Sequence, residues 1–116
     1  MQDAYLYAAG TLGIVISIVH GFLGETKIVA PSQAPASQAK RVMRAIMFIS
    51  AVYWFAGGLV LLLTPAVLTE AQRPLAVYGA AFLFLTGSLG NFWATKGRHF
   101  GWMLLAVAGG LAVAGA

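Results

Sequence analysis

Few side chains in this sequence have the chemistry of a reactive or ligand-binding site, and most of them fall near one end of the predicted fold. His20, Glu25, Asn91, Arg98 and His99 lie where apolar segments meet basic connections. Histidine exchanges protons near neutral pH, and histidine together with carboxylate binds metal ions. Polar groups inside apolar segments usually face protein and often mark function. We therefore treat these five residues as one candidate polar cluster.

Several chemical roles are open to this cluster. His20 and Glu25 could relay protons, and the same two residues with His99 could ligate a metal ion, although no local spacing motif supports a metal site. His20 and His99 could also hold a haem group between helices. In the simplest alternative, His20 bonds a neighbouring helix and Glu25 pairs with Arg98 at the membrane interface. We expect this last arrangement, and therefore no bound metal ion and no cofactor.

The remaining motifs argue against catalysis. The sequence contains no nucleophile beside a base, no phosphate-binding loop and no pair of carboxylates. It has no cysteine, which excludes disulfides, thiolate metal sites and cysteine nucleophiles. Its basic residues flank apolar segments and form no patch interleaved with polar surface, so nucleic acid is not expected as a partner. We predict that the protein is not an enzyme.

Four long segments that carry almost no charge must position the cluster. Among the 116 residues, 60% are apolar and 9% are charged, which favours lipid over water as the solvent of one small domain, residues 1–116. Each segment has about the length that a helix needs to cross ~30 Å of hydrocarbon. We predict an all-α bundle of four transmembrane helices. The predicted spans are residues 4–24, 44–64, 74–95 and 99–116.

The basic residues predict the orientation of the bundle. Of the seven Lys and Arg residues, all except Arg73 fall in the loop 25–43, at its border, or in the connection 96–98. Positive connections remain in the cytoplasm, so we expect a bacterial inner-membrane protein with both termini on the periplasmic side. The first segment lacks a basic leader, which indicates a retained helix and not a signal peptide.

Turn residues predict where the helices begin and end. Good helix formers after the prolines of the first loop indicate that the second helix begins in water near Ser37. It should end near Thr64, because Pro65 disfavours helical geometry in the residue before it. Residues 69–72 have the form of a capping box, and Pro74 suits the first turn of the third helix. Short connections then make successive helices antiparallel neighbours.

Small and aromatic residues should determine how the helices pack. Lipid is as apolar as leucine, so close backbone approach at small residues drives helix association in membranes. The candidates for helix packing are Gly21, Gly24, Gly87, Gly90, Ala106 and Gly110. Tyr53 and Trp54 fall near the middle of the second span, where the phenol O–H and indole N–H need partners. We expect both aromatic residues to pack in the bundle interior; the alternative is that they face a ligand.

Two motifs carry a resemblance to other proteins. Residues 20–25 read H-x-x-L-G-E, and residues 97–102 read G-R-H-x-x-W. In these motifs, and in its layout over the whole chain, the sequence resembles small four-helix inner-membrane proteins of bacteria that have no assigned activity. The resemblance implies that the polar cluster matters, without supplying an activity. Such proteins often carry a further histidine in the second helix. In this chain the corresponding residues, 48–51, contain no histidine.

The length and helix count also resemble those of the small multidrug-resistance transporters, but in architecture alone. Those proteins need a glutamate in the middle of the first helix, where this chain has apolar residues and a serine in residues 14–17. We expect a non-enzymatic accessory or interaction subunit, surrounded by the lipid bilayer and packed against other membrane subunits or itself. The alternatives are a homo-oligomeric transporter or channel for a small solute or ion, using His20 and Glu25, and a cofactor-binding membrane redox protein.

Overall fold

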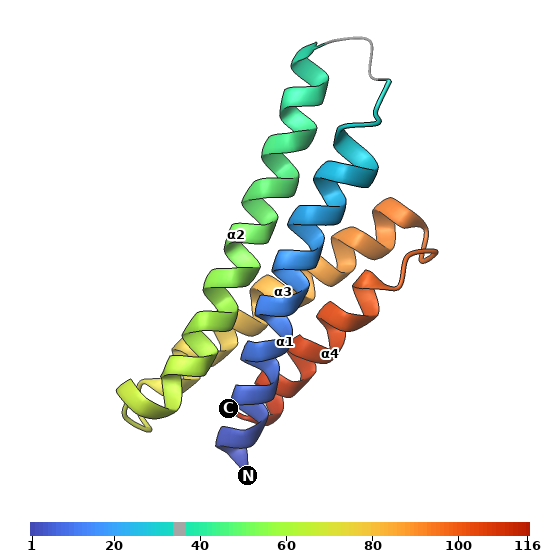
Figure 1. Ribbon diagram of the computed structural model, residues 1–116. Coiled ribbons are helices and arrows are strands. Elements are labelled where there is room, and N and C mark those ends of the chain that lie inside the picture. Colours follow the sequence, from blue (N-terminus) through green and yellow to red (C-terminus); the bar gives the residue numbers. More distant parts are fainter. Residues whose placement is uncertain (34–36) are drawn as a thin grey trace.

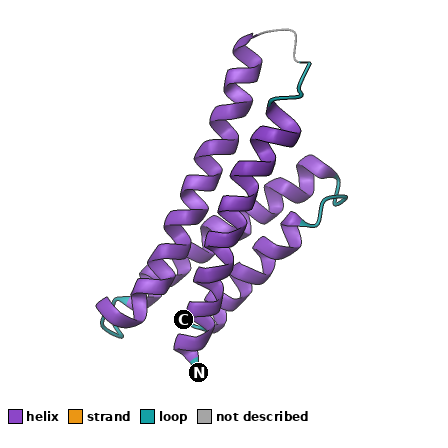
Figure 2. Ribbon diagram, in the orientation of Figure 1, coloured by secondary structure: helices purple, strands orange, loops and turns teal. Residues whose placement is uncertain are grey.

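Almost all of the chain is helical. The computed structural model describes residues 1–33 and 37–116, and within these ranges short turns connect long helices (Figure 2). The prediction of an all-α chain with four helices is confirmed for the described residues. The elements are α1 (Gln2–Leu23), its π-helical continuation η1 (Gly24–Val29), α2 (Ser37–Val67), α3 (Arg73–Thr95) and α4 (Gly101–Ala114).

The four helices form a ring in which each runs antiparallel to the one before it (Figure 1). α1 packs against α2 and α4, and α3 packs against the same two helices. Both chain termini therefore lie at one end, where the Gln2 side chain donates a hydrogen bond to the Ala116 carbonyl over 3.3 Å. The α1–α2 and α3–α4 connections lie at the other end.

The helices differ greatly in length. Three are long and apolar enough to cross a membrane, namely Gln2–Val29, Ser37–Val67 and Arg73–Thr95. α4 is apolar but has 14 residues, so it rises about 21 Å, less than the ~30 Å of hydrocarbon. α4 is thus shorter than the predicted fourth span, residues 99–116, because it begins at Gly101 and ends at Ala114. The α1–α2 hairpin extends well beyond the α3–α4 turn (Figure 1).

Two predicted boundaries are wrong. The predicted loop starts too early, because η1 continues α1 to Val29, whereas α2 begins at Ser37 as its helix-forming residues predict. α2 also continues past Pro65 to Val67. A proline so near the end removes one backbone hydrogen bond, and the Leu68 N–H still donates to the Thr64 carbonyl over 3.1 Å. The helix therefore ends one turn later than the proline predicts.

The start of α3 uses only part of the predicted capping box. The Gln72 side chain accepts hydrogen bonds from the Thr69 N–H over 3.1 Å and from the Thr69 hydroxyl over 3.0 Å. The helix itself begins at Arg73, with Pro74 in its first turn, where a missing N–H costs nothing. Residues 69–72 thus form a turn that precedes the helix.

Close backbone contact joins α1 to α2. A Cβ atom built on Gly10 would lie 2.7 Å from the Gly58 carbonyl oxygen, and one on Gly58 would lie 2.7 Å from the Gly10 oxygen. On α1, Gly13 leaves room for the ring of Phe84, a fully buried residue of α3. Interdigitation of small and large residues therefore closes the interior. The other large buried core side chains are Leu6, Trp54, Leu61, Val77 and Leu105.

Candidate functional site

His20 is a partly buried member of the predicted polar cluster. Its Nε2 lies 2.9 Å from the Ser50 hydroxyl of α2. The same hydroxyl lies 2.9 Å from the Ile46 carbonyl and 3.0 Å from the Met47 carbonyl, one turn back on its own helix. A hydroxyl has one hydrogen to give, so when it bonds to a carbonyl, Nε2 of His20 is the donor to Ser50. The imidazole thus ties α1 to α2.

An aromatic contact holds the other side of His20. The imidazole meets the Trp54 indole edge to face, with a distance of 4.5 Å between ring centroids and an angle of 60° between ring planes. Gly87 of α3 leaves space for that indole, because a Cβ there would lie 2.6 Å from its Nε1. Trp54 is 5% exposed. α1, α2 and α3 therefore meet around His20 and Trp54.

The two adjacent aromatic residues of α2 have opposite positions. Trp54 lies in the interior, whereas Tyr53 is 57% exposed on the outside of the bundle. Successive residues on an α-helix point about 100° apart, so the two side chains cannot share one narrow interior face. The expectation of an interior position therefore needs correction for Tyr53.

Glu25 pairs with Arg44 of α2. The Arg44 Nε donates to Glu25 Oε2 over 2.8 Å, and Nη2 donates to Oε1 over 2.7 Å, which makes a two-bond fork. The expected pairing with Arg98 is therefore wrong. The α1–α2 hairpin extends past the α3–α4 turn that carries Arg98, so α2 supplies the nearer cation. Both side chains of the pair remain about half exposed.

The π-helical segment η1 and a lysine hold the first connection in place. In η1 the Ala30 N–H donates to the Glu25 carbonyl over 2.8 Å, five residues back, which widens the helix. The Lys40 ammonium donates to the carbonyls of Ala30 and Ser32 over 2.9 and 3.4 Å. It thereby binds carbonyl groups at and just beyond the end of η1.

The remaining members of the predicted cluster serve their own part of the chain. The Asn91 amide donates to the Gly87 carbonyl of α3 over 2.9 Å. His99 stacks on Phe100, and its Nδ1 accepts a hydrogen bond from the Gly101 N–H over 3.1 Å. That bond satisfies one of the free donors at the start of α4. Arg98 is exposed in the α3–α4 turn.

The structure thus separates the five residues into local units. His20 with Ser50 lies between α1 and α2, Glu25 with Arg44 lies farther out on the same hairpin, and His99 caps α4. Across residues 1–33 and 37–116, no three His, Cys, Asp or Glu side chains gather as ligands for a metal ion. These contacts join two helices or fix a helix end.

Ser50 and Arg44 were not singled out from the sequence. A signal for Ser50 was present, since it is a lone hydroxyl in the apolar middle of α2, and such groups bond across helices in membranes. A similar hydroxyl joins the other hairpin, where Ser88 donates to the Trp102 carbonyl over 2.7 Å. The sequence carries no such signal for Arg44 as the partner of Glu25. That pairing depends on how far the α1–α2 and α3–α4 connections extend along the bundle.

The predicted packing residues fall into two groups. Gly24 lies against Met47, Gly21 faces Ala51 with 3.5 Å to a built Cβ, and Gly87 lies against Trp54. Ala106 is partly buried. Gly90 and Gly110, in contrast, are exposed, and a Cβ built on either meets nothing within 4 Å outside the helix's own backbone.

A second charged group lies at the end that carries the termini. Arg73, at the start of α3, donates through Nη1 to Asp3 over 3.0 Å and lies 3.2 Å from Glu70. Its Nη2 donates to the Pro65 carbonyl over 3.2 Å. The Arg73 side chain is 16% exposed. One guanidinium therefore connects the first residues of α1, the last turn of α2 and the start of α3.

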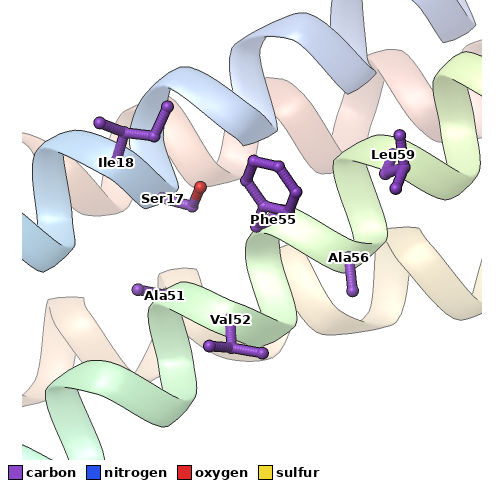
Figure 3. A pocket seen from close by; sticks show the side chains of 7 residues that line it. All are labelled: Ser17, Ile18, Ala51, Val52, Phe55, Ala56 and Leu59. Carbon is purple, nitrogen blue, oxygen red and sulfur yellow. The ribbon is translucent and has the colours of Figure 1, made fainter.

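An apolar groove runs over the outer surface between α1 and α2, with a volume of about 350 Å³ (Figure 3). α1 contributes Ser17 and Ile18, and α2 contributes the other lining residues. The Ser17 hydroxyl donates to the Ile14 carbonyl of its own helix over 2.7 Å, so the groove presents little polar surface. The residues that α2 contributes are Ala51, Val52, Phe55, Ala56 and Leu59.

No protein-family model matches the chain, and comparison with curated proteins and with solved structures finds no match.

Proposed function

We propose that the protein is a multi-pass subunit of the bacterial inner membrane with a non-enzymatic role, which packs against a second membrane protein or against another copy of itself. The contact is made by the outward face of α3. In this orientation the basic α1–α2 and α3–α4 connections face the cytoplasm, as positive connections do. The end with Arg73 and the two termini then faces the periplasm.

The contrast between two groups of glycines carries this proposal. Inside the bundle, neighbours fill the space beside each glycine, and a Cβ on Gly109 would lie 2.6 Å from the Leu85 side chain. Outside it, Gly79, Gly90 and Gly110 have nothing within 4 Å of a built Cβ. Glycine within a helix costs up to ~1 kcal/mol relative to alanine. Such positions are expected where another helix approaches closely.

The outward glycines of α3 share one face. Gly79 and Gly90 are eleven residues apart in the sequence, which corresponds to about three turns and a rotation of roughly 20°. The hydroxyl of Thr86, on the same exposed side, donates to the Phe82 carbonyl of its own helix over 2.7 Å. This face of α3 therefore has no side chain at two positions along the helix axis, Gly79 and Gly90. It also presents no strongly polar group.

The bonding of the polar residues also supports a structural role. Ser50 binds His20, Arg44 binds Glu25, and the Gly101 N–H binds His99. Each bond joins two helices or fixes a helix end. A catalytic or transport site needs groups aimed at a substrate, whereas these polar groups already bond within the chain.

The test adds bulk to the outward face of α3. The variant carries Gly79→Leu and Gly90→Leu together, and the control is Ala8→Leu, which adds a side chain at an exposed position of α1. Wild-type protein and control, extracted in mild detergent, should elute as the same assembly larger than a monomer. The double variant should elute as a free monomer that remains helical, because leucine favours the helix more than glycine does.

Two results would contradict the proposal. The first is a wild-type protein that is monomeric and free of partners in every mild detergent and in lipid nanodiscs. The second is an assembly that the double variant and Ala8→Leu disturb equally, since bulk would then matter regardless of its place.

A further inference from the structure

The groove between α1 and α2 lies on the side of the hairpin away from α3 and α4, whose ribbons pass behind it in Figure 3. Its lining side chains include Ile18, Val52 and Phe55, which are 60%, 45% and 43% exposed. In a membrane this surface faces hydrocarbon. A hollow with apolar walls and no free polar group fits a flexible hydrocarbon chain.

The groove continues along α2 towards cationic side chains. Arg41, Phe48 and Phe55 follow one another at intervals of seven residues, and residues at that interval stay within about 20° of one another per step. Phe48 is 68% exposed, so it extends the apolar face of α2 from the groove to Arg41. Between Arg41 and Val52 the helix rises about 16 Å, which is within the length of one lipid molecule.

The cations at this end exceed the anions. Glu25 is the acidic residue here, and the guanidinium of Arg44 binds both of its carboxylate oxygens. The Lys40 ammonium donates to backbone carbonyls, which carry no formal negative charge to balance it. Arg41 lies on the exposed surface one turn before Arg44. An anionic group that approaches along the groove therefore meets a net positive charge.

We propose that this groove binds one acyl chain of an anionic phospholipid, with the phosphate of its headgroup at Arg41. Basic sites beside transmembrane helices on the cytoplasmic side bind such headgroups. The apolar walls fix the chain, and Arg41 selects an anionic headgroup over a zwitterionic one. The excess of positive charge beside an apolar groove matches a molecule with an anionic head and a hydrocarbon tail, so the charge favours lipid as the occupant. This site lies on α1 and α2, apart from the face of α3 proposed for assembly.

The test uses the absence of cysteine from the chain. A fluorophore on Val52→Cys reports lipid in the groove, and one on Val107→Cys of α4 serves as the control, since the two valines are 45% and 51% exposed. Each labelled protein is placed in phosphatidylcholine vesicles that contain brominated phosphatidylglycerol or brominated phosphatidylcholine. Bromine quenches the fluorophore on contact, so the ratio of the two association constants measures selection at each site.

We expect phosphatidylglycerol to be favoured about fivefold at Val52→Cys, the effect of one basic residue at the surface, and hardly at all at Val107→Cys. Adding Arg41→Gln should lower the ratio at the groove to near one, while Arg41→Lys should retain most of it. Arg98→Gln, which removes a cation from the shorter hairpin, should leave the ratio unchanged.

Three results would overturn the proposal. An equal preference at the two labelled positions would show that the whole protein surface, and not the groove, attracts anionic lipid. An equal loss with Arg98→Gln and Arg41→Gln would assign the preference to the general field of the membrane surface. Quenching at Val107→Cys, with no quenching of Val52→Cys by either lipid, would show that a protein covers the groove.

Discussion

Alanine in place of Gly10 or Gly58 should destabilise the bundle, whereas alanine in place of Gly110 should not. The two inner glycines face each other across the contact between α1 and α2, and a new Cβ on either would lie 2.7 Å from the carbonyl oxygen of the other. Ordinary contact begins at 3.4 Å. The obstructing atom belongs to the backbone, so no side-chain rotation can relieve the overlap. The helices must separate by about 0.7 Å, the difference between these distances.

The magnitude follows from two opposing effects. Extra carbon in a packed interior costs about 1–3 kcal/mol, and replacing glycine by alanine in a helix returns up to ~1 kcal/mol. We therefore expect Gly10→Ala and Gly58→Ala each to lower the free energy of unfolding by about 1–2 kcal/mol. At Gly110 a Cβ meets nothing within 4 Å, so Gly110→Ala should leave that free energy unchanged or raise it.

The free energy of unfolding can be measured by titrating the protein in mild detergent with sodium dodecyl sulfate. Trp54 is buried where α1, α2 and α3 meet, so tryptophan fluorescence should follow the separation of the helices. Equal effects of Gly10→Ala and Gly110→Ala, in either direction, would refute the close contact between α1 and α2. A double variant of Gly10 and Gly58 should lose less than the sum of the single losses, because one displacement relieves both overlaps.

Three further predictions address the polar contacts. Arg73→Leu removes the ion pairs to two carboxylates and should lower the free energy of unfolding in the same titration by about 1–3 kcal/mol; an unchanged value would mean that Arg73 joins no helices. Ser50→Ala and His20→Ala, combined in a double-mutant cycle, should show a coupling of about 0.6 kcal/mol, as measured for hydrogen bonds between membrane helices; additive losses would exclude the bond. In intact cells an impermeant thiol reagent should label Glu70→Cys and not Gln33→Cys, and the reverse pattern would invert the proposed orientation.

The number of helices follows from the sequence, because charge is confined to the connections and each apolar segment can be counted. Their ends follow less well. Pro65 predicts an end of α2 at Thr64, yet the helix continues to Val67 because a proline near a helix end removes few bonds. The sequence likewise gives no signal for η1, since the shift from four- to five-residue hydrogen bonds depends on how the segment packs against α2.

In the candidate site, too, some features can be predicted from the sequence and others depend on the fold. His20 and Glu25 stand out as polar residues in or beside an apolar segment, so their importance can be predicted from type alone. Their partners depend on helical rotation and on height along the bundle. Trp54 faces inward and Tyr53 outward because the rotation of α2 permits only one of them inside. Arg44 binds Glu25 because the first hairpin is longer than the second.

The unequal helices have a consequence for the surrounding bilayer. Residues 37–44 of α2 include three basic side chains, so the apolar part of this helix, residues 45–67, is about 34 Å long, whereas α4 with its 14 residues is about 21 Å long. Lipids adjust to the hydrophobic length of the protein that they touch, at a cost of fractions of a kcal/mol per Å of mismatch. The membrane beside α4 should therefore be thinner than that beside α2, over a protein only 25 Å wide along its second principal axis. Because of this difference in bilayer thickness, the protein should be favoured in regions of the membrane that are already deformed.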